Sequence, residues 1–251
     1  MSCKALSSSS GTEHTETHAQ ERHATVSAFG LSAERREPCA PANVFWHAGT
    51  VSGEARARRF GCAPLTFWLT GLSGAGKSTI AYEFENLLIR DGQPCAVLDG
   101  DNLRHRLNCD LGFSERDRHE NVRRTAEVAR LMNENGLIVV ASLVSPYRVD
   151  RETAKAIVGA DRFVEVHVST SLDVCESRDP KGLYRKARSG ELRGFTGVSS
   201  PYEPPAEPAL VVDTAASTPA SAAAFLHAYL HEQNGGVFVA AYASAEACPG
   251  R

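Results

Sequence analysis

Long hydrophobic runs are absent from this sequence of 251 residues, although 42% of its residues are apolar. No stretch approaches the ~20 apolar residues that span a bilayer, and the N-terminus lacks the apolar core of a secretory signal. Neither sign of charge dominates, because the formal net charge is -3, which argues against a broad nucleic-acid-binding face. We therefore expect a cytoplasmic protein that binds neither a membrane nor nucleic acid.

Cysteines with the spacing of a zinc or redox site are also lacking. The seven cysteines, at positions 3, 39, 62, 95, 109, 175 and 248, form no C-x-x-C pair and no zinc-like pattern with histidine. We expect reduced thiols, several of them buried as small apolar residues. Redox control through a pair such as Cys39 and Cys109 is an alternative that no motif supports.

The two ends of the sequence differ in composition from its middle. Residues 1–40 are rich in Ser, Thr, His and Glu and poor in apolar positions, so we expect a disordered N-terminal tail. A transit peptide is the alternative, but five glutamates contradict the acid-poor composition of such peptides. Residues 41–233 are expected to form one domain, and residues 234–251 a flexible C-terminal extension.

Short apolar runs alternate with helical patterns through the middle of the sequence. Buried strands are expected at residues 65–69, 95–98, 137–143, 163–168 and 209–212. Helices are expected at residues 77–90, 114–135, 151–158, 172–177 and 219–231. This alternation predicts an α/β fold of three layers, with a parallel five-stranded sheet between helices. Ligands of such folds bind at the carboxyl ends of the strands.

The first of these strands is followed by a complete phosphate-binding loop. Residues 71–79 read Gly-Leu-Ser-Gly-Ala-Gly-Lys-Ser-Thr and match G-x-x-x-x-G-K-[ST] between a strand and a helix. Backbone N–H groups of the loop would surround an anion, Lys77 would reach the β and γ phosphates, and Ser78 would hold Mg²⁺. A simple Gly-rich turn is the alternative reading. The context favours an ATP-type site and a P-loop NTPase fold.

Acidic residues follow the second strand. Asp99 and Asp101 flank a glycine at the edge of the sheet where the phosphate-binding loop lies. Asp101 is a candidate for orienting an acceptor hydroxyl, and Asp99 is either a Mg²⁺ ligand or a helix cap. On the helix that opens at Ser114, Arg118 and Asn121 share a face near the N-terminus, which favours a second anionic ligand. A solvated Arg-rich face is the alternative.

Two further segments follow later strands. Ser145 lies at the end of the third strand, either as a phosphoserine intermediate or as a group that only hydrogen-bonds a ligand; direct transfer needs no enzyme nucleophile. Residues 178–200 are basic and punctuated by glycine, which predicts a lid that closes over the nucleotide and excludes water. An exposed basic patch is the alternative reading of this segment.

Taken together, these motifs resemble the adenylylsulfate kinase family over residues 43–213. Besides the phosphate-binding loop, the resemblance rests on Asp-Gly-Asp-Asn-Leu-Arg at residues 99–104, Lys-Gly-Leu-Tyr at 181–184 and Gly-Phe-Thr-Gly at 194–197. It implies transfer of phosphate from ATP, with Mg²⁺, to the 3'-hydroxyl of adenosine 5'-phosphosulfate. It also implies a homodimer, and a separate ATP sulfurylase that supplies the acceptor.

The resemblance assigns a role to each matching residue. Lys77, Asp101 and Lys181 would act in catalysis, with Ser145 as a phosphoserine candidate, and Ser78 and Asp99 would bind the metal ion. The implied ATP site comprises Gly71, Ser73, Gly74, Ala75, Gly76, Lys77, Ser78, Thr79 and Arg178. The implied acceptor site comprises Asp101, Asn102, Leu103, Arg104, Phe113, Arg118, Asn121, Val144, Ser145, Lys181, Gly194 and Phe195.

The sequence departs from the family pattern at Arg106 and Cys109, and bulk at position 106 would alter affinity if it lies near the pocket. Other functions stay open at this point. They are a kinase for a nucleoside, gluconate or shikimate, a retired homologue that acts as an interaction domain, and a GTP-dependent switch. The switch lacks support because the sequence has no Asn-Lys-x-Asp guanine motif.

Overall fold

The computed structural model describes residues 43–234. The chain divides into two compact units, Met1–Ala48 and Gly49–Arg251. In the first unit only residues 43–48 are described, and they form no helix or strand. The expected tail at residues 1–40 lies outside the described residues. So does the expected C-terminal extension, except for Asn234, which caps the last helix.

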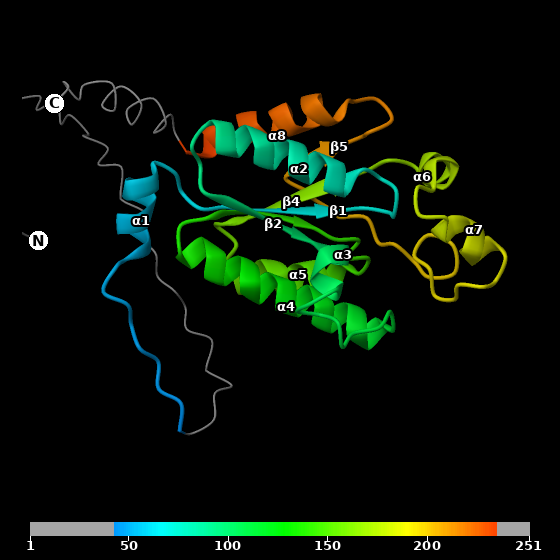
Figure 1. Cartoon of the computed structure of the whole chain (residues 1–251), viewed down its shortest axis with the longest axis horizontal. Coiled ribbons are helices and arrows are strands. Elements are labelled where there is room, and N and C mark those ends of the chain that lie inside the picture. Colours follow the sequence, from blue (N-terminus) through cyan, green and yellow to red (C-terminus); the bar gives the residue numbers. More distant parts are fainter. Residues whose placement is uncertain (1–42, 235–251) are drawn as a thin grey trace, which may run out of the picture. The chain divides into compact units, whose positions relative to one another are not determined.

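The second unit is built on a five-stranded parallel sheet (Figure 1). Its strands are β1 (Thr66–Thr70), β2 (Cys95–Asp99), β3 (Ile138–Ser142), β4 (Phe163–Val168) and β5 (Leu210–Val212). Their order across the sheet is β2-β3-β1-β4-β5, and every pair is parallel. The predicted α/β fold and all five expected strands are confirmed, with ends that shift by one residue at most.

Strand register brings the carboxyl ends of the central strands to one edge of the sheet. Leu69 pairs with Ser142 of β3, and Ser142 pairs with Asp99 of β2. Because the strands are parallel, the loops that follow β1, β2 and β3 leave from this same edge. The phosphate-binding loop, the acidic segment and the segment that contains Ser145 therefore meet there.

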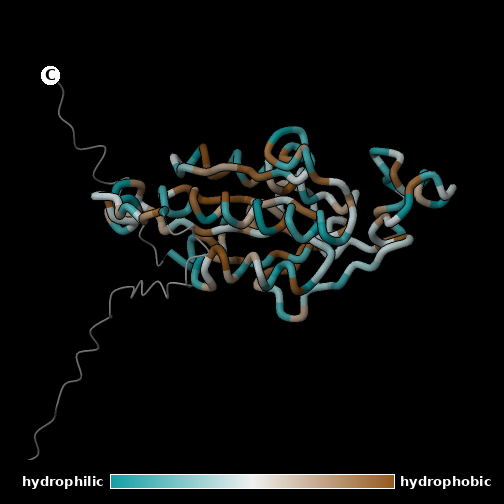
Figure 2. The backbone as a smooth tube through the Cα atoms, turned by 90° about the horizontal axis from the view of Figure 1, so that it is seen from below, coloured by the Kyte–Doolittle hydropathy of each residue, from teal (hydrophilic) through white to brown (hydrophobic). Residues whose placement is uncertain are grey.

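Helices cover both faces of the sheet. The helices α2 (Lys77–Arg90) and α8 (Pro219–Gln233) lie on one face, and α4 (Glu115–Glu134) and α5 (Arg148–Val158) lie on the other (Figure 1). Successive side chains of a strand point to opposite faces, so Phe67 packs with the α2 and α8 layer while Trp68 packs with α4 and α5. The rings of Phe67 and Phe84 meet edge to face with centroids 4.9 Å apart. Figure 2 shows hydrophobic stretches concentrated between the layers.

Four short helices complete the unit. They are α1 (Gly53–Phe60), α3 (Gly100–Arg104), α6 (Leu172–Arg178) and α7 (Leu183–Arg188). Of these, α6 was expected, and α3 is the helix that Asp99 was expected to cap; α1 and α7 were not anticipated. Neither α1 nor α3 buries any residue completely, so each lacks the apolar stripe from which a helix is recognised. None of the helices among residues 43–234 has the length and apolar character needed to cross a membrane.

Candidate active site

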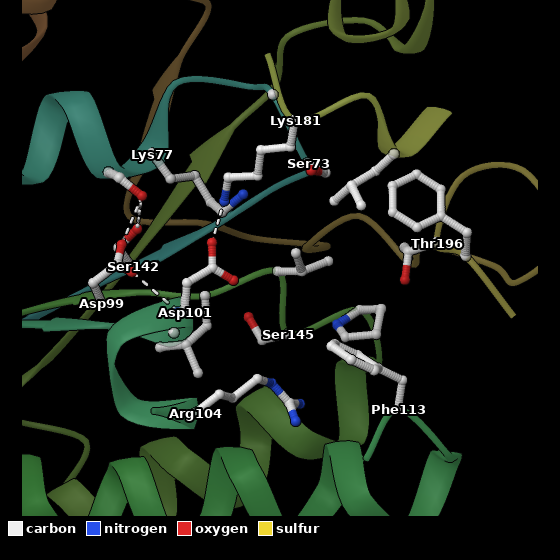
Figure 3. Close-up of a pocket in the computed structure, with 18 of the residues that line it drawn as sticks. Ser73, Lys77, Asp99, Asp101, Arg104, Phe113, Ser142, Ser145, Lys181 and Thr196 are labelled. Carbon is white, nitrogen blue, oxygen red and sulfur yellow. Dashed lines mark hydrogen bonds and ion pairs between the residues drawn. The ribbon is translucent and has the colours of Figure 1, made fainter. Parts of the chain in front are cut away.

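A cavity of about 560 Å³ opens at the carboxyl edge of the sheet (Figure 3). Its wall is formed by the phosphate-binding loop, the β2–α3 and β3–α5 connections, the start of α4 and the segment between α6 and residue 196. Most of the residues assigned from the sequence line it. These are Ser73, Gly74, Gly76, Lys77, Ser78, Thr79, Asp99, Asp101, Arg104, Phe113, Arg118, Asn121, Val144, Ser145, Arg178, Lys181, Gly194 and Phe195.

Backbone conformation explains the glycines of the phosphate-binding loop. Gly74 and Gly76 have φ angles of 77° and 95°, a region that strongly favours glycine. A Cβ at Gly76 would also lie 3.2 Å from a methyl carbon of Thr214. Since Gly76 is the N-cap of α2 and offers no capping side chain, the first N–H groups of this helix are left for a bound anion.

Lys77 is held inside the loop. Its Nζ donates to the carbonyl oxygens of Gly71 at 2.9 Å and Leu72 at 2.7 Å. Burial lowers the pKa of Lys77 to about 8, and the nearby charge of Lys181 acts in the same direction. A phosphate group beside this amine would stabilise its charged form, so the site is electrostatically prepared for an anion.

Three oxygen-bearing side chains gather beside the loop (Figure 3). The Oγ of Ser78 donates to Oδ2 of Asp99 at 2.6 Å and lies 3.3 Å from Oγ of Ser142. The other carboxylate oxygen of Asp99 caps α3 by accepting from the N–H of Asp101 at 3.0 Å and of Asn102 at 3.3 Å. The helix-cap interpretation of Asp99 is therefore confirmed, and its other carboxylate oxygen faces the hydroxyl of Ser78. Its role as a Mg²⁺ ligand stays a prediction.

Asp101 projects into the middle of the cavity, where it pairs with Lys181 (Figure 3). Both side chains are more than half exposed. They are therefore available to a ligand rather than locked in the core. Lys181 reaches Asp101 from the segment between α6 and α7, and its charge lies near the Lys77 amine, so a ligand between the phosphate-binding loop and Asp101 would meet both cations.

The segment that carries Lys181 is anchored to the phosphate-binding loop. The hydroxyl of Tyr184, on α7, donates to the carbonyl of Ser73 at 2.9 Å. The carboxylate of Asp179 accepts from the N–H of Tyr184 and of Arg185, both at 3.1 Å, and so fixes the start of α7. The predicted lid thus begins as an ordered turn and helix.

Arg178, at the end of α6, faces the chain after β5 on the other side of the loop. It donates to Oγ1 of Thr214 at 2.7 Å and to the Thr214 carbonyl at 2.9 Å. The same Thr214 hydroxyl donates to the carbonyl of Ala75 at 2.9 Å. Arg178 therefore lines the cavity and also braces the phosphate-binding loop through Thr214.

The far end of the cavity combines an aromatic ring with two guanidinium groups. Phe113 is 64% exposed, and the guanidinium carbon of Arg104 stands 4.4 Å from its ring centroid. Arg118 lies 5.9 Å from the same ring and donates to Oγ1 of Thr196 at 3.0 Å and to the Gly194 carbonyl at 2.9 Å. Burial lowers the pKa of both arginines, and their mutual repulsion adds to the lowering at Arg104. An aromatic, cationic pocket of this kind suits an anionic purine compound.

The arginines of α4 fulfil both interpretations of its sequence, because one lines the cavity and others lie on the surface. Arg118 faces the cavity, whereas Arg123 and Arg124 both pair with Glu120 on the surface. Asn121 also lines the cavity, and its Oδ1 accepts from the side chain of buried Asn108 at 3.1 Å. This bond directs the amide nitrogen of Asn121 away from Asn108.

Ser145 is buried and its backbone has a φ of 37°. Its Oγ accepts from Nε1 of Trp68 at 3.1 Å, and its carbonyl accepts from Arg151 at 2.8 Å. Arg151 is itself buried and also donates to Glu165 at 2.7 Å and to the Glu203 carbonyl at 2.7 Å. The Arg151 guanidinium therefore holds the strained turn that presents Ser145 to the cavity.

Four of the assigned residues lie outside the cavity lining. Gly71 and the fully buried Ala75 contribute backbone structure to the loop. Asn102 donates to the hydroxyl of Tyr82 at 3.0 Å, and Leu103 packs against the core beneath α4. The departures at positions 106 and 109 are exposed and do not line the cavity either, so the proposed effect of Arg106 bulk has no structural basis.

The structure also adds lining residues that the sequence reasoning did not assign. They are Gly100, Val122, Ser142, Leu143, Pro146, Pro180, Leu183, Leu192, Arg193 and Thr196. Ser142 was the most accessible to prediction, because it ends a strand next to β1 at the edge that binds ligands. Thr196 lies in the Gly-Phe-Thr-Gly motif, but its contact with Arg118 joins residues 78 positions apart and needs the fold to be known.

A parallel sheet with a phosphate-binding loop, and a carboxylate opposite that loop, defines the class as a P-loop phosphotransferase. The sequence matches the adenylylsulphate kinase family over residues 63–213. It is 56% identical over 176 residues to the adenylyl-sulfate kinase of Geotalea daltonii, an alignment that covers 70% of this chain and 87% of that protein. The corresponding enzyme of Pseudomonas entomophila is 54% identical, with 70% and 85% covered.

The solved structures agree with the sequence relatives. The APS kinase of Mycobacterium tuberculosis, solved in complex with AMPPNP and APS, has a TM-score of 0.65 and 44% identity. That match covers 68% of this chain and 99% of the solved one. The chain belongs to the adenylylsulphate kinase family.

Proposed function

We propose that this protein transfers the γ-phosphoryl group of ATP to the 3'-hydroxyl of adenosine 5'-phosphosulfate. The products are ADP and 3'-phosphoadenosine 5'-phosphosulfate. The observation that carries the proposal is one cavity with Lys77 at its phosphate-binding end, Phe113 and Arg104 at its other end, and Asp101 between them. Family membership, and a relative solved with AMPPNP and APS, support the same pair of substrates.

The ATP phosphates would lie on the loop at the start of α2. N–H groups of the helix N-terminus and the Lys77 amine would hold the β and γ phosphates. The oxygens of Ser78, Asp99 and Ser142 form a donor set that fits Mg²⁺, which prefers oxygen ligands. When bound, this ion would neutralise charge that develops between the β and γ phosphates.

The acceptor would occupy the far end of the cavity. The exposed ring of Phe113 offers a stacking surface for adenine, while Arg104 and Arg118 lie on the same side and suit the phosphosulfate group. This arrangement would leave the ribose near Asp101. An acceptor with two anionic groups accounts for two arginines whose charged forms are disfavoured by burial in the free protein.

Transfer would then be direct. The acceptor oxygen forms a bond to the γ phosphorus as the bond from that phosphorus to the β–γ bridging oxygen breaks, and ADP leaves. Asp101 orients the hydroxyl and accepts its proton, and Lys181 and Lys77 stabilise the charge on the transferring group. Ser145 Oγ, which accepts from Trp68 in the free protein, serves as a ligand contact and not as a phosphoryl acceptor.

Further expectations rest on this assignment. We propose that the enzyme is a homodimer in the cytoplasm, and that a separate ATP sulfurylase supplies its acceptor. Size-exclusion chromatography with light scattering measures the first of these directly. A monomer at assay concentration would contradict it without affecting the assignment of the reaction.

An acceptor panel tests the proposed substrate. ADP release is followed with ATP, Mg²⁺ and, in turn, adenosine 5'-phosphosulfate, AMP, adenosine, gluconate and shikimate. We expect acceptor-dependent ADP release with adenosine 5'-phosphosulfate and at least a hundredfold lower kcat/KM with the others, because each lacks either the purine or the sulfated anion. Equal or better turnover with a sugar or with shikimate would contradict the proposal.

A further inference from the structure

Away from the cavity, the described part of the chain brings together three side chains that can bind a metal ion. Asp91, which is the C-cap of α2, lies beside His227 and His231 of α8. Their ligating atoms, one carboxylate oxygen and two imidazole nitrogens, all lie within 4.8 Å of one another. Because a helix rises about 1.5 Å per residue, Asp91 stands roughly 20 Å from Lys77 at the start of α2. The cluster is therefore separate from the phosphate-binding loop.

Helix geometry aligns the two imidazoles. His227 and His231 are four residues apart and so lie on one face of α8, with ring centroids 4.4 Å apart. Their Nε2 atoms are 3.3 Å apart. In a tetrahedral zinc site with Zn–N distances of about 2.0–2.1 Å, two nitrogen ligands stand about 3.3 Å from each other. The two histidines thus already occupy adjacent corners of such a site.

A small movement of the Asp91 carboxylate would place one of its oxygens at a third corner of the tetrahedron. Its Oδ2 lies 2.6 Å from Nε2 of His227 and 3.9 Å from Nε2 of His231, on either side of the spacing that a tetrahedron needs. The side chains of Asp91, His227 and His231 are 43%, 20% and 38% exposed, so an ion can reach them and water can complete its coordination. The ring of Phe84 meets His227 edge to face at 6.5 Å and restricts its orientation.

We propose that Asp91, His227 and His231 bind a divalent transition-metal ion, with Zn²⁺ as the ion that fits best. Two imidazoles and one carboxylate favour Zn²⁺, Ni²⁺ or Cu²⁺ over Mg²⁺ and Ca²⁺, which prefer sets of oxygen ligands. The ion links the C-terminal end of α2 to α8. It therefore stabilises the helix pair on the face of the sheet where α2 carries the phosphate-binding loop at its other end.

Metal binding by the whole chain tests the site. The chelator-treated protein is titrated with Zn²⁺ alone by calorimetry, and then with Co²⁺ while its absorption spectrum is recorded. We expect one ion per chain, cobalt d–d bands without thiolate-to-metal charge transfer, and a melting temperature about 5–10 °C higher when free Zn²⁺ is about 100 times Kd. A thiolate band would overturn the proposal, because the ion would then be bound by cysteines.

Variants separate the cluster from the rest of the surface. His231→Gln and Asp91→Asn should each weaken Zn²⁺ binding at least tenfold, while the matched controls His47→Gln and Asp161→Asn should bind as the unaltered chain does. Equal affinity in all four variants, or no stoichiometric binding at all, would refute the site. Should one of the two cluster variants fail to fold by circular dichroism, the other still decides the question.

Discussion

The buried amine of Lys77 makes nucleotide affinity depend on pH around its lowered pKa of about 8. Burial lowers the Lys77 pKa to about 8 in the free protein, and bound phosphates would raise it again. Only the charged amine pairs with phosphate, so binding above pH 8 must take up a proton. The charged fraction falls from about nine-tenths at pH 7 to about one-tenth at pH 9. The Kd of a non-hydrolysable ATP analogue should therefore weaken about tenfold between these pH values.

The assay is calorimetric or fluorescence titration at fixed ionic strength across that pH range. Lys77→Arg is the matched variant, because a guanidinium stays charged and its Kd should change little with pH. A Kd for the unaltered protein that is flat from pH 7 to pH 9 would show that the charge of Lys77 does not control nucleotide binding in this range. So would an equal slope in Lys77→Arg, since another group would then be responsible.

Three other predictions concern Asp101 and Phe113, which line the cavity, and Arg151, which supports the turn at Ser145. Asp101→Ala should lower kcat by about 10²–10⁴ while the melting temperature stays close to that of the unaltered chain; unchanged turnover in a steady-state assay would remove Asp101 from the reaction. Phe113→Ala should raise KM for adenosine 5'-phosphosulfate by roughly 5-fold to 100-fold, the value of one base stack, and leave KM for ATP unchanged. An equal rise in both constants would argue against stacking. Arg151→Met removes a charged donor from Glu165 and from the carbonyls of Ser145 and Glu203, so we expect the melting temperature to fall by about 6–20 °C in calorimetry. A fall of less than 2 °C would show that the turn at Ser145 is held by other contacts.

Local sequence patterns predicted much of the fold. The β-strands are short apolar runs, and α2 follows a loop motif that fixes its first residue, so both could be predicted directly. Burial on both faces holds throughout β1 and β3, whereas Val211 of the edge strand β5 is 55% exposed. The helix α1 was missed because it buries no residue and so has no apolar stripe, although Ser52 and Gly61 cap it locally. The helix α7 could not be predicted because it depends on tertiary contacts. Tyr184 on α7, for example, is buried, and its hydroxyl donates to the carbonyl of Ser73, which lies 111 positions earlier in the sequence.

In the candidate site, too, the features set by local sequence could be predicted, and those set by long-range contacts could not. The helix expected to open at Ser114 does so, and the Ser114 side chain caps it by accepting from the N–H of Asp117, whose carboxylate accepts from the Gly112 N–H. Lys77 and Asp101 lie in sequence motifs from which their chemical roles could be predicted. The support that Arg151 gives to Ser145 comes from buried charge and long-range hydrogen bonds, and no spacing in the sequence encodes it.

The position of the transferred phosphoryl group in the product identifies the acceptor atom directly. The protein is incubated with adenosine 5'-phosphosulfate, Mg²⁺ and ATP labelled with ¹⁸O in its γ-phosphoryl group, and the nucleotide product is analysed by mass spectrometry and ³¹P NMR. We expect one labelled phosphoryl group on the 3' oxygen of the acceptor and an equal amount of ADP. Label on another position of the acceptor, or labelled inorganic phosphate alone, would contradict this expectation.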